Sequence, residues 1–271
     1  MGYVGLKELG GTGIMVPEIG LGTSQYLGGA EPLRRGIELG AALIDTAEMY
    51  QNEEDVGRFV YGLRDKVFLA TKVLSSHLRY DQVMRSAEES LRKLAVDCID
   101  LYQIHRPNND IPIAETMSAM EALVDAGLVK HVGVSNFSTR ELREAQEAMT
   151  KYPIVSNQVA YNLNKRGIER DLLPYCQQNR VTVIAYSPLA IGSLASSSWF
   201  RRDQASQSLK KVAKQVGKSV AQVALNWCIS QPNVIAIPKS SSLKRIEENC
   251  GASGWRLSAD QLNVLDKAFA N

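Results

Sequence analysis

The sequence predicts an α/β protein built as a (β/α)8 TIM barrel, and three observations support this expectation. Short apolar segments alternate along the chain with segments of helical periodicity, which is typical of parallel βα units. The apolar segments are nearly continuous, which indicates strands covered on both faces of a sheet. Eight such units in 271 residues suit one closed barrel. A doubly wound open sheet is the alternative that this pattern also allows.

The chain is expected to begin with a small β-hairpin that precedes the barrel. Residues 4–9 and 14–16 are apolar and flank Gly10-Gly11-Thr12-Gly13, a sequence that favours a turn. The expected barrel strands then follow as short apolar runs, which are residues 19–22, 42–45, 67–72, 98–104, 129–134, 155–160, 181–187 and 234–238.

Segments with helical periodicity separate these strands. Residues 81–94 carry apolar side chains at helical spacing, Gly40 and Gly127 follow the ends of two others, and Ser138 opens a capping box with Glu141. A second capping box, Ser258 to Gln261, opens a last helix that runs to residue 270. The other expected helices are residues 32–39, 52–62, 113–126, 169–179, 207–216, 220–230 and 243–250.

The order of these segments predicts extra helices after the seventh strand and at the C-terminus. No linker or low-complexity segment interrupts the pattern, so residues 1–271 are expected to form a single domain. The chain is 45% hydrophobic and 22% charged, an ordinary globular composition.

Composition also argues against several function classes. A net charge of +2 does not indicate the basic surface of a nucleic-acid-binding protein. No apolar run approaches the roughly 18 residues of a membrane span. The first residues lack the features of a signal peptide. The four cysteines are scattered without metal-ligand spacing, and His77 and His131 have no partners for a metal site. We therefore expect a cytoplasmic protein with reduced cysteines, without a bound metal, nucleic acid or membrane as partner.

Four residues suited to proton transfer are expected at one end of the barrel. Asp45, Lys72 and His105 end the second, third and fourth strands, and Tyr50 lies in the loop after the second. Active sites of such barrels lie at the C-terminal ends of the strands. A carboxylate at the end of a buried strand needs a cation, which Lys72 can supply. The same lysine would favour the phenolate of Tyr50 and lower its pKa from the ordinary value near ~10.

Each of these residues also has a simpler interpretation. Asp45 and Lys72 can be a structural ion pair, Tyr50 a packing residue and His105 a histidine on the barrel rim. A barrel aldolase or isomerase that uses Lys72 as a Schiff base is a further alternative, but a lysine paired with a carboxylate stays charged and forms imines poorly. The joint placement of the four residues favours proton transfer.

The sequence around these residues resembles the aldo-keto reductases. Residues 45–57 (DTAEMYQNEEDVG) are similar to the first signature of that family, and residues 101–107, 133–137 and 237–240 resemble its other motifs in the same order. The resemblance extends from Leu6 to Phe269, and it is closer to short-loop microbial members such as diketogluconate reductases. It implies NADPH-dependent reduction of an aldehyde or ketone with a broad substrate range, by a chain that we expect to be a monomer. A non-catalytic NADPH-binding subunit of the same fold is the alternative, which the four filled catalytic positions disfavour.

The resemblance implies a role for each site residue. Tyr50 would protonate the carbonyl oxygen, Lys72 would lower its pKa, Asp45 would hold Lys72, and His105 would orient the substrate. A 2′-phosphate adds a charge of up to about −2, so cations beside it would favour NADPH over NADH. The residues implied in cofactor binding are Gly22, Thr23, Ser135, Asn136, Gln158, Tyr186, Ser187, Leu189, Ser193, Lys239, Ser240, Arg245, Glu248 and Asn249.

The sequence departs from the family pattern at the substrate pocket. Arg106 follows the histidine where the family commonly has tryptophan, and it would line the pocket and favour a polar or anionic carbonyl substrate. The alternative is an arginine that only faces solvent. The chain ends at Asn271 without the long C-terminal loop of many relatives, so we expect an open site with Trp199 and Phe200 as movable lids.

Overall fold

Eight parallel strands form a closed barrel in the computed structural model, which describes residues 4–194 and 204–270. Neighbouring strands pair in sequence order, and parallel bridges from Ile19 to Ala236 and from Gly22 to Lys239 join the last strand to the first. The predicted barrel is therefore confirmed and the open sheet is wrong. The strands are β3 (Leu21–Gly22), β4 (Leu43–Asp45), β5 (Phe68–Val73), β6 (Ile99–Ile104), β7 (Val129–Ser135), β8 (Ile154–Ala160), β9 (Thr182–Tyr186) and β10 (Val234–Ala236).

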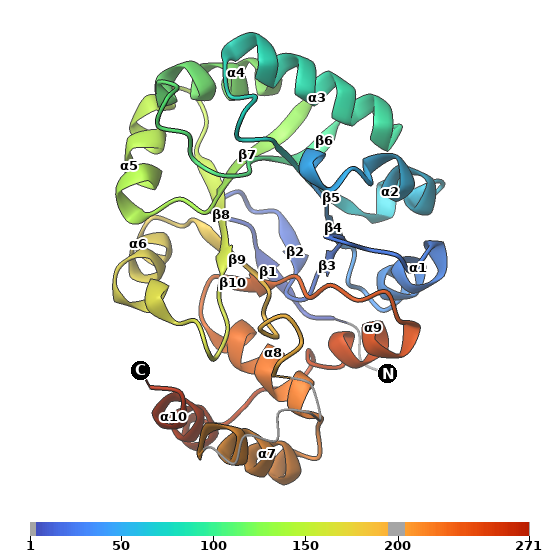
Figure 1. Cartoon of the computed structure of the whole chain (residues 1–271), viewed down its shortest axis with the longest axis vertical. Coiled ribbons are helices and arrows are strands. Elements are labelled where there is room, and N and C mark those ends of the chain that lie inside the picture. The colour runs from blue at the N-terminus through green and yellow to red at the C-terminus, as the bar shows by residue number, and fades with distance from the viewer. Residues whose placement is uncertain (1–3, 195–203, 271) are drawn as a thin grey trace.

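Helices surround the barrel, as Figure 1 shows. Serine side chains cap the N-termini of three of the described helices, at Ser138, Ser219 and Ser258, and the caps at Ser138 and Ser258 were expected from the sequence. The helices are α1 (Ala30–Glu38), α2 (Glu53–Val60), α3 (Tyr80–Leu94), α4 (Ile113–Asp125), α5 (Thr139–Ala148), α6 (Leu172–Gln178), α7 (Gln204–Val216), α8 (Val220–Ser230), α9 (Leu243–Cys250) and α10 (Ala259–Ala268).

The extra helices predicted after the seventh barrel strand and at the C-terminus are both present. Helices α7 and α10 pack side by side outside the ring (Figure 1). Three short 3-10 helices were not predicted, because a turn of three or four residues has no periodicity to detect. They are η1 (Glu48–Tyr50), η2 (Arg64–Lys66) and η3 (Gly167–Arg170). No helix in the described part of the chain has the length and apolar character needed to cross a membrane.

The predicted N-terminal hairpin closes one end of the barrel. Its strands β1 (Leu6–Glu8) and β2 (Met15–Pro17) pair antiparallel, and Leu9 and Val16 are fully buried against the apolar barrel interior. The backbone amide of Gly10 donates to Thr182 Oγ1 at 2.7 Å, which ties the hairpin to β9. This closure leaves the opposite end of the barrel as its open mouth.

The barrel interior changes from apolar to polar along the strands toward that mouth. Side chains on a strand alternate between its two faces, so a residue two positions further along points the same way. In β4, β5 and β6 this step leads from the buried apolar residues Leu43, Ala70 and Leu101 to the buried polar residues Asp45, Lys72 and Gln103. Lys72 pairs in register with Gln103 across β5 and β6. The sequence of these strands therefore places charge and amide groups in one layer below the mouth.

Candidate active site

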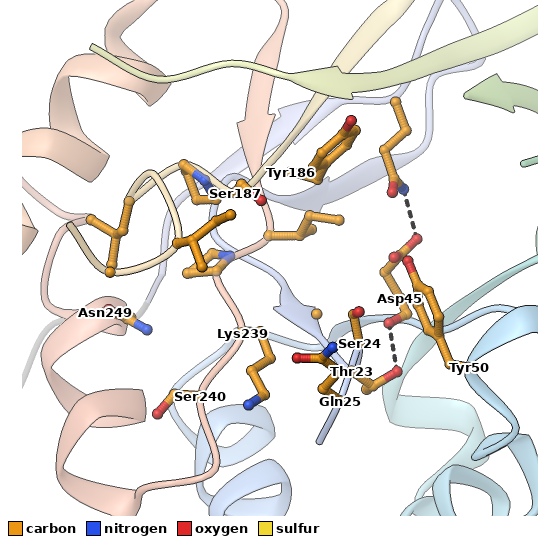
Figure 2. Close-up of a pocket in the computed structure, with 18 of the residues that line it drawn as sticks. Thr23, Ser24, Gln25, Asp45, Tyr50, Tyr186, Ser187, Lys239, Ser240 and Asn249 are labelled. Atoms are coloured by element: carbon orange, nitrogen blue, oxygen red, sulfur yellow. Dashed lines mark hydrogen bonds between the residues drawn. The ribbon is translucent and has the colours of Figure 1, made fainter. Parts of the chain in front are cut away.

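A cavity of about 610 Å³ opens at the C-terminal mouth of the barrel, within the usual range of ligand pockets of roughly 300–1,000 Å³. Asp45, Tyr50 and His105 line one end of it. Lys239 and Asn249 line the other end, and Figure 2 shows them across the cavity from Asp45 and Tyr50. The residues come from loops after different strands, so the barrel fold itself brings them together.

Asp45 and Lys72 form the buried ion pair that the sequence predicted. Lys72 Nζ lies 2.6 Å from Asp45 Oδ1 and donates to the carbonyl oxygen of Thr46 at 2.8 Å. The Lys72 side chain is 0% exposed and that of Asp45 is 3% exposed. A buried pair is stable only when its remaining hydrogen-bonding capacity is satisfied. Asp45 Oδ2 meets that condition because it accepts from Gln158 Nε2 at 2.7 Å and from Gln103 Nε2 at 3.3 Å.

Tyr50 lies directly beside this pair. It is the last residue of η1, and Lys72 Nζ is 5.1 Å from the centroid of its ring. Burial raises the pKa of Tyr50 above its ordinary value, and the positive charge of Lys72 opposes that effect without overcoming it. Lys72 lowers the pKa of Tyr50 as the sequence predicted, but burial, which the sequence did not predict, is the larger contribution and leaves the pKa raised. At neutral pH Tyr50 is a neutral phenol, which is the form able to give up a proton.

His105 faces Tyr50 across the same end of the cavity. The two rings meet edge to face, with centroids 5.6 Å apart at an angle of 87°. Burial, and next the charge of Lys72, lower the pKa of His105 to about 4. Its Nδ1 is buried and has no hydrogen-bond partner among the described residues. A neutral imidazole donates one hydrogen bond and accepts another, so His105 can hold a polar group beside the Tyr50 hydroxyl.

A row of fixed polar side chains continues from this end along the cavity. Ser135 Oγ donates to the carbonyl oxygen of Gln158 at 2.8 Å, and Asn136 Nδ2 donates to that of His105 at 3.0 Å. Tyr186 Oη donates to Asn136 Oδ1 at 2.9 Å. Asn136 has a φ of 61°, a left-handed conformation that asparagine tolerates better than most residues. These groups are held in place by the protein itself.

The far end of the cavity is rich in positive charge. Lys239 follows β10, and Arg245 lies in the first turn of α9, where the helix dipole also favours an anion. The remaining predicted cofactor residues that line the cavity are Gly22, Thr23, Ser135, Asn136, Gln158, Tyr186, Ser187, Leu189, Ser240, Glu248 and Asn249. Ser193 does not line it, because its segment turns back and its backbone amide donates to the carbonyl oxygen of Ala190. Trp199 and Phe200 lie outside the described residues.

Arg106 follows His105 in the chain and lines the same cavity. It is exposed and takes part in no salt bridge within the described part of the chain. Of the two interpretations of this arginine, the cavity position fits the first, although its exposure also fits a residue that faces solvent. No group of three His, Cys, Asp or Glu side chains in residues 4–194 and 204–270 is arranged to hold a metal ion.

Sequence reasoning missed several residues of the cavity wall. Ser24 and Gln25 follow β3 directly, and Met49 precedes Tyr50, so their places at strand ends were a usable signal. Gln103 is not part of the wall, but its buried amide, which contacts Asp45, was also missed; it lies on β6, two positions before His105. The other wall residues that were not predicted are Pro188, Ile191, Gly192, Ala221, Ile237 and Pro238.

The closed barrel carries a neutral tyrosine beside a buried lysine at one end of its cavity and two cations at the other. This combination is that of a (β/α)8-barrel oxidoreductase. A family model described as the aldo/keto reductase family matches residues 18–270. The chain therefore belongs to the aldo-keto reductase family.

Individual relatives agree with this assignment. The chain is 38% identical to the methylglyoxal reductase YeaE of Escherichia coli strain K12, over 94% of this chain and 92% of the relative. A crystal structure of the thermostable aldo-keto reductase Tm1743 is 39% identical and has a TM-score of 0.89, covering 97% of this chain and 99% of that one. An aldo/keto reductase from Klebsiella pneumoniae in complex with NADP and acetate is 38% identical, with a TM-score of 0.88 and 99% and 96% coverage.

Proposed function

We propose that the chain reduces small aldehydes and ketones to alcohols with NADPH, using Tyr50 as the proton donor. The observation that carries this proposal is the placement of a neutral Tyr50 between the Asp45–Lys72 pair and His105 at one end of a cavity with cations at its other end. The relatives support it, since one is a methylglyoxal reductase and another was solved with NADP.

The cavity fits the two ends of NADPH. Ser135, Asn136 and Gln158 offer hydroxyl and amide groups near Tyr50, where an amide-bearing ring can be recognised. Lys239 and Arg245 offer two cations at the far end, which suit a 2′-phosphate with a charge of up to about −2. When bound, NADPH supplies the hydride that adds to the carbonyl carbon.

The protein's own residues deliver the proton. A carbonyl oxygen held by the neutral imidazole of His105 lies within reach of the Tyr50 hydroxyl, which donates its proton as negative charge develops on that oxygen. The charge of Lys72 then stabilises the phenolate that remains. Asp45 keeps Lys72 in place, and burial keeps the proton on Tyr50 until the transfer occurs.

The wall around this end of the cavity favours small polar substrates. Ser24, Gln25 and Arg106 offer polar groups to a substrate among the described residues of the wall. We infer a broad range of small carbonyl compounds, with Arg106 improving the binding of those that carry a carboxylate.

The proposal is tested by following NADPH oxidation with methylglyoxal, neutral aldehydes and 2-oxo acids, for the wild type and Tyr50→Phe. Tyr61→Phe is the matched control, because Tyr61 is 80% exposed and is not part of the cavity wall. We expect turnover in the wild type and control, a loss of at least about 10²–10⁴-fold in Tyr50→Phe, and unchanged NADPH binding by fluorescence titration. NADPH binding without turnover of any carbonyl, or full turnover in Tyr50→Phe, would contradict the proposal.

A further inference from the structure

A carboxylate outside the cavity joins the turn that carries Tyr50 to the loop that follows Lys72. Glu48 is the first residue of η1 and Tyr50 is its last. Glu48 Oε2 accepts a hydrogen bond from the backbone amide of Leu74 at 2.8 Å, and Glu48 Oε1 lies 2.7 Å from His77 Nδ1. Leu74 comes directly after β5, the strand that contains Lys72.

The η1 turn is short and has few hydrogen bonds of its own. No residue of η1 is fully buried, and its own backbone bonds are those from Tyr50 to Ala47 at 2.9 Å and from Gln51 to Glu48 at 3.2 Å. The turn ends at Gln51, which has a φ of 54°. A single 3-10 turn has poor hydrogen-bond geometry and fixes its orientation weakly.

Other contacts fix the segments before and after the turn. Toward β5, Lys72 Nζ donates to the carbonyl oxygen of Thr46 at 2.8 Å, and Thr71 Oγ1 donates to Glu53 Oε1 at 2.6 Å. Toward β3, the contacts run through Asn52. Thr46 Oγ1 donates to Asn52 Oδ1 at 2.8 Å, and Asn52 Nδ2 donates to the carbonyl oxygen of Thr23 at 2.7 Å. These bonds orient the turn relative to the loop after β3. Glu48 adds side-chain contacts that join η1 itself to the loop after β5, the strand that carries Lys72.

We propose that Glu48 is a positioning residue for Tyr50, and that its carboxylate keeps the phenol in its place beside Lys72 and His105. This inference rests on the proposed function of Tyr50 as the proton donor. Hydrogen bonds from a backbone amide to a carboxylate are stronger than neutral ones. A misplacement of a reacting group by 1 Å can lower the rate about 10²-fold, so even a small shift of η1 has a measurable effect.

The two contacts of Glu48 can be separated by mutation. Glu48→Gln keeps an oxygen that accepts from the Leu74 amide, whereas Glu48→Ala removes it, and His77→Gln removes only the imidazole partner. The backbone contact alone ties η1 to the end of β5, so it carries the positioning effect. Glu54→Ala is the matched control, because Glu54 is an exposed acid in the first turn of α2, one turn away in the chain.

The first measurement is steady-state kinetics with the best carbonyl substrate. We expect kcat in Glu48→Ala to fall by about 10–100-fold, with KM for NADPH within about twofold of the wild type. Glu48→Gln and His77→Gln should retain most of the activity, and Glu54→Ala all of it. Wild-type kcat in Glu48→Ala would overturn the inference, as would an equal loss in Glu54→Ala.

The second measurement does not depend on turnover. The ring carbon of Tyr50 in protein carrying 13C-labelled tyrosine is assigned by its absence from Tyr50→Phe, and it is titrated with pH by NMR. A phenol that has moved changes both its burial and its distance from Lys72, so Tyr50 should titrate at a different pH in Glu48→Ala than in Glu48→Gln, which has lost the same charge. The same titration in folded Glu48→Ala and Glu48→Gln proteins would contradict the positioning role. Because this readout needs no substrate, it separates failure of the inference from failure of the proposed function.

Discussion

Gln158 donates a hydrogen bond from Nε2 to Oδ2 of Asp45 at 2.7 Å, on the side of the carboxylate that faces away from Lys72. Gln103 Nε2 reaches the same oxygen at 3.3 Å, and its own Oε1 lies 3.3 Å from Gln158 Nε2. Both amides are buried, so the charge of Asp45 is stabilised by fixed dipoles and not by water. A residue of the proposed nicotinamide site is thus directly bonded to the carboxylate that holds Lys72.

Replacing Gln103 tests the importance of these amides. Gln103→Leu keeps the volume of the side chain and removes one donor to the buried carboxylate, so we expect the free energy of unfolding to fall by about 1–3 kcal/mol. We also expect a lower kcat, because Asp45 would hold Lys72 less firmly. Urea unfolding and steady-state kinetics measure the two effects. Gln215→Leu, on the exposed face of α7, is the control, and a Gln103→Leu variant as stable and active as this control would show that the amide is dispensable.

The structure explains why glycine is found opposite Gln103. A Cβ atom at Gly133 would lie 3.0 Å from Gln103 Cγ and 2.5 Å from Ser156 Oγ. The second distance is shorter than real Cβ contacts allow, so a side chain at this position of β7 would displace Ser156 and crowd Gln103. The GVSNF segment therefore supplies room for the amide layer as well as the polar residues Ser135 and Asn136.

The two cations at the far end of the cavity predict cofactor selectivity. Lys239→Ala and Arg245→Ala should each raise KM for NADPH by about 10-fold or more, since each removes one charge-assisted contact to the 2′-phosphate. KM for NADH should change little, because that cofactor lacks the phosphate. Kinetics with both cofactors measure the ratio. Lys244→Ala is the control, because Lys244 is an exposed neighbour outside the cavity wall, and an equal effect there would point to general surface charge.

The barrel could be predicted from the sequence because its apolar strands and capped helices are local patterns. The ion pair of Asp45 and Lys72 could also be predicted, since a barrel aligns the ends of neighbouring strands. The role of Glu48 could not be predicted, because its partners Leu74 and His77 lie 26 and 29 positions further along the chain. Only the conformation of the η1 turn in the folded protein brings the Glu48 carboxylate to them.

The raised pKa of Tyr50 could not be predicted for a related reason. The sequence identified the cation that lowers the pKa, but the larger opposing effect comes from burial, which depends on the packing of the whole mouth. The failure of Ser193 to reach the cavity has the same origin. Its place is set by a loop that contains left-handed residues at Ser187, Ala190 and Ile191, a conformation that their residue types do not predict.

Arg106 provides a test of substrate selectivity. Arg106→Gln should raise KM for a carboxylated carbonyl substrate by about 10-fold, because a charge-assisted contact is lost, and should leave neutral aldehydes nearly unchanged. Arg106→Lys keeps the positive charge and should retain part of the preference. The comparison of kcat/KM for a 2-oxo acid and a neutral aldehyde of similar size measures it. An unchanged ratio in Arg106→Gln would assign this arginine to the solvent-facing rim.

The lowered pKa of His105 predicts how stability depends on pH. The unfolded chain binds a proton at this histidine below pH ~6.5, whereas the folded protein, with a pKa of about 4, does not until the pH is much lower. Stability rises with pH wherever the unfolded state binds more protons. The contribution of His105 is therefore complete above pH ~6.5 and is lost as the pH falls toward about 4.

The size of this loss can be measured against a variant that does not titrate. The difference between pKa values of about 4 and ~6.5 corresponds to about 3 kcal/mol. Urea unfolding at pH 7 and at pH ~4.5 should show that the wild type loses more stability than His105→Gln, by up to that amount. His131, whose pKa is also lowered by burial, is present in both proteins and cancels in the comparison. Equal losses in the two proteins would mean that His105 is already protonated in the folded state, and a charged imidazole at this position would change the hydrogen bond offered to the substrate oxygen.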